Sequence, residues 1–327
     1  MNFKLVAEHA EARRAGPLPI GDWVFRGLVY GCGLMLLAII VAMVYELVDG
    51  ASLSMNKFGV SFLWGTTWNP VTGEFGALPL IFGTIATSLV ALVFAVPLSI
   101  GTAVFIAELA PRWLRAPTSY LIEVIAAIPS VILGFWGLFV LVPFMREHVQ
   151  PILGNNLGFI PLFEGPQFGL GILTAGIILS IMVVPIITAV ARDIFLAVPN
   201  HQREAMLALG ATRWEVVSKA VLPYSRSGLI GAVILGLGRA IGETMAVTMV
   251  IGNSPRVTSS LFAPQYTMAA VLANEFAEAS GDLYLHALVE IGLVLFTITL
   301  IINVISRLFI WSMGAGRPRL FRQPARK

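Results

Sequence analysis

Six long apolar runs constrain this chain more than any other feature of its sequence. An α-helix needs about 20 apolar residues to cross the hydrocarbon core of a bilayer. Charged residues make up 12% of the chain, about half the share in soluble domains, and mean hydropathy is +0.86. The sequence therefore predicts an all-α, polytopic membrane protein with six transmembrane helices. The runs cover residues 24–48, 76–107, 118–145, 168–191, 229–252 and 283–313.

The first run is interpreted as a retained helix rather than a cleaved signal peptide. It follows 23 residues that carry both signs of charge, and no A-x-A cleavage site precedes Tyr45. The chain has a single cysteine, Cys32, within this run. One cysteine forms no intramolecular disulfide, so we interpret Cys32 as a packing residue.

Lysines and arginines are distributed unequally over the segments that connect the runs. The N-terminal segment 1–23, the loop 192–226 and the tail 314–327 belong to the alternate set that holds most of the 21 basic residues. The positive-inside rule assigns this richer set to the cytoplasm. We therefore expect both termini in the cytoplasm on either side of a transmembrane domain at 24–313, and we attribute the net charge of +3 to topology rather than to nucleic-acid binding. The other set holds Lys57, Arg146 and Arg256.

Proline interrupts three of the runs, at Pro97, Pro129 and Pro185. A proline within a helix removes a hydrogen bond and bends the axis. The sequence predicts kinks in the second, third and fourth helices, with the hydroxyl of Ser130 beside the second kink.

The fifth run contains an arginine and a glutamate in the stretch GLGRAIGETMAV, residues 236–247. If the run is one helix, Arg239 and Glu243 lie four residues apart beside a stripe of glycines that suits close approach of another helix. The predicted lipid-facing side opposite this stripe consists of Ile230, Leu237 and Ile241.

A charge at the centre of a transmembrane helix costs about 2.5–3.5 kcal/mol on insertion scales, so Arg239 requires a partner or an aqueous cavity. Glu243 is the nearest candidate. One interpretation is a purely structural ion pair. The other is a ligand site, because a guanidinium binds oxyanions through paired, charge-assisted hydrogen bonds.

The loop 192–226 contains a predicted amphipathic helix from Arg203 to Lys219. Its mixed charge favours a protein partner over an in-plane membrane position. The stretch EAMLALGATRWEVVSKAVLP, residues 204–223, resembles the coupling motif EAA-x3-G-x9-I-x-LP of ATP-binding-cassette importer permeases, although Met206 and Ala220 depart from it. The resemblance implies that this loop contacts an ATPase, with Gly210 as a turn and Pro223 at a helix end. The matching residues are Glu204, Ala205, Gly210, Leu222 and Pro223.

Four stretches together resemble the PstC-type permease subunits of high-affinity phosphate importers: GLGRAIGETMAV, AAIPS at 126–130, IGN at 251–253 and ANEFAEA at 273–279. The resemblance implies the type I importer permease fold and import of inorganic phosphate by alternating access across a bacterial inner membrane. It also implies a homologous sister permease, two ATPase subunits and a periplasmic phosphate-binding protein. The candidate translocation residues are Arg239, Glu243, Ser130 and Glu123.

The chain is not expected to be an enzyme. A nucleotide-binding P-loop requires a Gly-Lys pair, and no lysine here follows a glycine, so we expect no cofactor on this chain and assign ATP and magnesium to the partner ATPase. The four histidines are scattered, which predicts no metal site. The alternatives are a permease for molybdate or sulfate, and a secondary transporter or channel.

The balance of charge at membrane depth leaves the state of the pair open. Arg239 is accompanied by Glu123, Glu243 and, further along, Glu290, which is not a field that attracts a dianion. Additional positive charge from the sister permease, release of Arg239 by Glu243 when the ligand enters, and a protonated glutamate are all compatible with the sequence.

Overall fold

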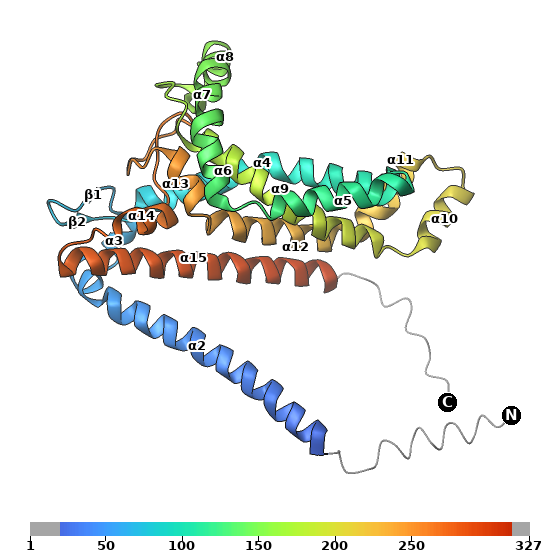
Figure 1. The fold of residues 1–327 in the computed structure, drawn as a ribbon, viewed down its shortest axis with the longest axis horizontal. Helices are drawn as coiled ribbons and strands as arrows, with labels where there is room; N and C mark the ends of the chain where they lie inside the picture. The colour runs from blue at the N-terminus through green and yellow to red at the C-terminus, as the bar shows by residue number, and fades with distance from the viewer. Residues whose placement is uncertain (1–19, 316–327) are drawn as a thin grey trace. The chain divides into compact units, whose positions relative to one another are not determined.

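The computed structural model describes residues 20–315 and is almost entirely helical (Figure 1). The predicted N-terminal and C-terminal segments therefore lie largely outside the described residues. Helix α2 (Ile20–Phe58) contributes its residues 20–50 to one compact unit. The second unit begins at Ala51 and contains all the other elements.

Six helical segments of the described chain are long and apolar enough to cross a membrane, which confirms the predicted number of spans. They extend over Gly21–Phe58, Leu78–Leu109, Ser130–Leu157, Ile172–Leu196, Arg213–Ile241 and Asp282–Ser312.

Helix α9 (Ile172–Leu196) is the centre of the second unit, because it packs against both α4 (Leu78–Val104) and α12 (Leu222–Ile241) (Figure 1). Small residues make this contact close: a Cβ added at Gly176 would lie 2.4 Å from Cγ1 of Val90. The helices are also joined by polar contacts, as the Ser99 hydroxyl donates to the Val184 carbonyl over 3.2 Å. Close backbone approach and interhelical hydrogen bonds are what hold helices together where apolar burial is weak.

The helices that follow α4 and α9 extend the bundle at one end. Helix α4 continues through a π-helical turn, Phe105–Leu109, and a short connection leads to α5 (Arg112–Ala126). After α9 come α10 (Asn200–Ala208), α11 (Arg213–Val216) and a second π-helical turn at Val217–Val221, which runs into α12. Figure 1 shows α10 and α11 together at this end, away from α13 and α14.

The opposite end contains the remaining short elements. Helix α3 and a two-stranded antiparallel hairpin precede α4, with Trp68 paired to Phe75. Helices α6, α7 and α8 form the third span together with two π-helical turns, and α15 (Asp282–Ala315) forms the last. The bounds of the others are α3 Ser61–Trp64, β1 Trp68–Asn69, β2 Glu74–Phe75, α6 Ser130–Trp136, α7 Val142–Phe144, α8 Gln150–Leu157, α13 Met245–Ile251 and α14 Met268–Glu275.

The third apolar run is not one kinked helix, so the predicted internal kink at Pro129 is wrong. Helix α5 ends at Ala126, and Pro129 is the N-cap of α6, which begins at Ser130. A proline disfavours helical geometry in the residue before it, and this ends the first helix. Pro97 and Pro185 do lie within helices, as predicted.

The fifth run is also broken. Helix α12 ends at Ile241 and α13 begins at Met245, so the single helix predicted through Gly252 is wrong. Glycine has low helix propensity, and Gly238 and Gly242 fall in the last turn and at the C-cap of α12. The charged pair therefore lies at a helix end rather than in a helix centre.

Candidate functional site

Arg239 and Glu243 are joined across the break between α12 and α13. Arg239 lies in the last turn of α12, and its Nη2 is 3.3 Å from Oε2 of Glu243, which lies in the connection. The Glu243 side chain is 4% exposed, whereas the Arg239 side chain is 50% exposed. A buried carboxylate thus holds a guanidinium that still presents donors to its surroundings.

The surface around Arg239 is uncovered in the single chain. Leu235 and Met245 are exposed hydrophobic residues, and a Cβ at Gly238 would meet no atom within 4 Å. Ile241, predicted to face lipid, is instead 3% exposed. Ile230 and Leu237, the other two residues of that predicted face, are partly buried, so other parts of the chain cover this side of α12.

The structure does not bring the other two candidate translocation residues to this pair. Glu123, on α5, is 64% exposed and lies 4.0 Å from Nη1 of Arg192 on α9. Ser130 is the first residue of α6 and is partly buried. Among residues 20–315, no hydrogen bond or ion pair connects Ser130 or Glu123 with Arg239.

Helix α6 nevertheless lies directly against α13. A Cβ added at Gly134 would be 2.7 Å from Sδ of Met249 and 3.0 Å from Cα of Ala246. The break that contains Glu243 and the start of α6 thus belong to one closely packed region of the second unit. Helix α6 begins after Pro129, and α13 begins after the break at Gly242, and each of these residues interrupts an apolar run.

The motif residues of the loop 192–226 are spread over α10, the turn after it and the start of α12. Glu204 and Ala205 are exposed on α10, and Gly210 has φ +81°, a left-handed conformation that glycine adopts without strain. The predicted amphipathic helix Arg203–Lys219 is therefore two helices with a turn between them. A capping box between Thr212 and Glu215 fixes the start of α11.

Pro223 has a different position from the predicted one. It follows Leu222, directly after the π-helical turn Val217–Val221, in a span that is helical from Arg213 to Ile241, so the helix does not end at Pro223. A π-helical turn interrupts the regular hydrogen-bond ladder, so a residue without an N–H is accommodated there.

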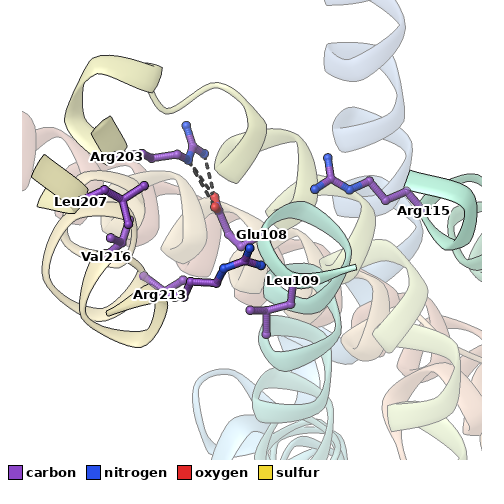
Figure 2. A pocket seen from close by; sticks show the side chains of 8 residues that line it. Glu108, Leu109, Arg115, Arg203, Leu207, Arg213 and Val216 are labelled. Atoms are coloured by element: carbon purple, nitrogen blue, oxygen red, sulfur yellow. Dashed lines mark hydrogen bonds and ion pairs between the residues drawn. The ribbon is translucent and has the colours of Figure 1, made fainter. Parts of the chain in front are cut away.

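Sequence reasoning missed a second ion pair, which lies at the same end as the motif. Nη2 of Arg203, on α10, is 2.7 Å from Oε1 of Glu108 in the π-helical turn after α4. The two side chains meet at a pocket of about 300 Å³, which Arg115 and Arg213 also line. Figure 2 shows Arg203 and Glu108 pointing toward each other. The only sequence signal is that each residue is a charge next to an apolar segment, and they are 95 positions apart.

Comparison with known proteins identifies the family. Residues 95–321 match the model of binding-protein-dependent transport system inner membrane components. The chain is 46% identical to a phosphate transport system permease protein PstC of Mesorhizobium japonicum, with 90% of this chain and 91% of the relative covered. It is 49% identical to the PstC protein of Pasteurella multocida, with 88% and 91% covered. The chain belongs to the PstC family of permease proteins.

Solved structures agree with PstC family membership at the level of the fold. The chain is similar to the inward-facing MetNI methionine ABC transporter, with a TM-score of 0.56 at 17% identity, covering 75% of this chain and 99% of that one. It is also similar to a bacterial alginate ABC transporter in complex with an alginate-bound periplasmic protein, with a TM-score of 0.55 at 16% identity, covering 88% and 94%. The fold is that of ABC importer permeases, as predicted.

Membership in the PstC family places this chain among transport components rather than enzymes. Six apolar helices make it a multi-pass membrane protein. Assembly with an ATPase and a binding protein is a property of this family of ABC permeases.

Proposed function

We propose that this chain is one of two permease subunits of an ATP-driven importer that moves inorganic phosphate into the cytoplasm by alternating access. The observation that carries the proposal is the half-exposed guanidinium of Arg239, held at a helix break by a buried carboxylate. Relatives that are 46–49% identical are named as phosphate permeases, and this similarity supports the same substrate here.

The chemistry of the pair favours phosphate over the fully deprotonated oxyanions. The Arg239 guanidinium donates to phosphate oxygens, and arginine suits this role because its donors are fixed in a planar fork. When it is ionised, the Glu243 carboxylate can accept hydrogen bonds but cannot donate one. Inorganic phosphate keeps a proton at neutral pH, so its O–H group can donate a hydrogen bond to Glu243. Sulfate and molybdate have no proton to donate, so their negative charge would face the carboxylate without a hydrogen bond.

The partners follow from the surfaces that this chain leaves uncovered. The exposed face around Arg239, with Leu235 and Gly238, would lie toward the homologous sister permease and the shared pore, and the sister subunit would supply further positive charge. The exposed part of α10, with Glu204 and Ala205, would contact one of two ATPase subunits. A periplasmic phosphate-binding protein would deliver the substrate at the other end.

Localisation follows from the distribution of charge. The positive-inside rule places the loop 192–226 and both termini in the cytoplasm of a bacterial cell, with the chain in the inner membrane. ATP and magnesium would bind on the ATPase, so hydrolysis reaches this chain only as movement of α10 and α11. No cofactor is proposed for this chain.

Assembly tests the proposal first. Affinity purification of the tagged chain from its native membrane should recover a second, homologous permease and a nucleotide-binding subunit at about twice the molar amount of this chain, because two ATPase subunits serve two permeases. Composition is measured by quantitative mass spectrometry of the detergent-solubilised complex. A chain recovered alone, with transport activity of its own, would support a secondary transporter or channel instead.

A further inference from the structure

We propose that the Arg203–Glu108 ion pair is the mechanical strut that transmits movement of the ATPase-contacting helix α10 into the second and fourth spans. The inference rests on the proposed function, since it assumes that an ATPase moves α10. It names two positioning residues for transport, neither of which belongs to the coupling motif at 204–223.

Arg203 binds the ends of two spans with one side chain. Its Nε and Nη2 donate to Glu108 in the turn after α4, at 3.1 and 2.7 Å. The same Nη2 donates to the Phe195 carbonyl in the last turn of α9 over 2.7 Å, and Nη1 donates to the Val198 carbonyl just beyond it. The last carbonyls of a helix have no intrahelical partner, so this arginine completes the end of α9 as well as the pair.

Helical geometry explains why Arg203 can connect the surface to the interior. Successive residues of an α-helix project about 100° apart. Glu204 is therefore exposed on one side of α10 while Arg203, the preceding residue, turns inward to Glu108 (Figure 2). A displacement of the exposed side of α10 would be carried directly to the ends of α4 and α9, which pack against each other along the bundle.

The side chains of this pair are less exposed than those of another ion pair in the same loop. The side chains of Arg203 and Glu108 are 17% and 13% exposed. Lys219 and Glu215, also an ion pair, are 64% and 36% exposed and belong to neighbouring turns of one helical segment. An exposed pair of that kind contributes little, whereas removing one partner of a buried pair strands a charge and is strongly unfavourable.

The π-helical turn at Phe105–Leu109 is suited to receive such movement. π-helical turns interrupt the regular hydrogen-bond ladder and are frequent at functional positions in helices. Glu108 lies within this turn, and Ala110 closes it by donating to the Phe105 carbonyl. Arg115, at the start of α5, donates to the Ala110 carbonyl over 2.9 Å, so α5 is connected to the same turn.

The test compares solute moved per ATP hydrolysed by the complete complex in proteoliposomes. Glu108→Gln keeps the shape and removes the charge, and Arg203→Lys keeps the charge and removes the fork. Lys57→Gln, which changes an exposed lysine outside the loop 192–226, is the control. We expect both strut variants to assemble with the ATPase and to hydrolyse ATP, while phosphate moved per ATP falls at least about fivefold, the lower range of allosteric coupling. Lys57→Gln should leave the ratio unchanged.

The double variant Glu108→Gln with Arg203→Gln separates a strut from a structural pair. It leaves no stranded charge, so a merely structural pair would recover a normal ratio; a strut stays uncoupled. A normal ratio in either single variant or in the double variant would overturn the proposal, as would loss of ATPase binding in both single variants. If the wild-type complex moves a different anion, the proposed substrate is wrong, and the strut is still tested by the ratio of that anion to ATP.

Discussion

Replacing Arg239 with glutamine should lower the rate of phosphate uptake at least about 100-fold, while the complex still assembles. The expected loss reflects removal of the proposed charge-assisted hydrogen bonds from the guanidinium to phosphate, together with the loss of the cationic partner of Glu243, whose side chain is 4% exposed. Glu243→Gln should also abolish uptake, because the carboxylate is the proposed acceptor for the phosphate proton. Uptake of labelled phosphate is measured alongside the amount of assembled complex.

The double variant decides whether the pair only holds the helix break together. If it is structural, Arg239→Gln with Glu243→Gln leaves no unpaired charge and uptake should recover. If the pair contacts the substrate, the double variant stays inactive, and this is the expected result. Arg26→Gln, which changes an exposed arginine on α2 outside both proposed sites, is the control and should retain uptake.

The second large effect is expected at the exposed motif of α10 and its turn. Gly210→Pro should uncouple or release the ATPase, because Gly210 has φ +81° and proline is restricted to φ near −65°. No atom lies within 4 Å of a Cβ at this position, so the effect comes from the backbone rather than from a clash. Glu204→Lys should have the same result by reversing an exposed charge at the proposed contact.

ATPase co-purification and transport are measured together for these variants. Gly281→Pro is the matched control, because Gly281 also has a positive φ of 102° with no atom within 4 Å, but lies just before α15 at the opposite end. It should retain the ATPase. Normal co-purification and normal uptake in Gly210→Pro would contradict the proposal that this loop couples the ATPase to transport.

The sequence predicted the six spans because their apolar length is set by the thickness of a bilayer, a constraint that each span meets on its own. It predicted the ion pair of Arg239 and Glu243 because the two residues are neighbours along the chain. The prediction of a single helix failed for the third and fifth apolar runs, because each contains residues that break the helix. Hydropathy continues through Pro129 and Gly242, but the backbone there leaves the helical path.

The Arg203–Glu108 pair could not be predicted from the sequence for a different reason. The two residues are 95 positions apart, and only the packing of α10 against the end of α4 brings them together. Pro223 shows a related ambiguity, since proline usually ends a helix, and only the π-helical turn directly before it lets the helix continue into α12. Local patterns identify elements, whereas contacts between distant segments depend on the whole fold.

The most direct test of the account is transport by the purified complex of this chain, its sister permease, the ATPase and the phosphate-binding protein in proteoliposomes. We expect accumulation of labelled phosphate that requires ATP on the cytoplasmic side and persists in a large excess of sulfate or molybdate. Uptake that proceeds without ATP, or accumulation of sulfate or molybdate in place of phosphate, would contradict it.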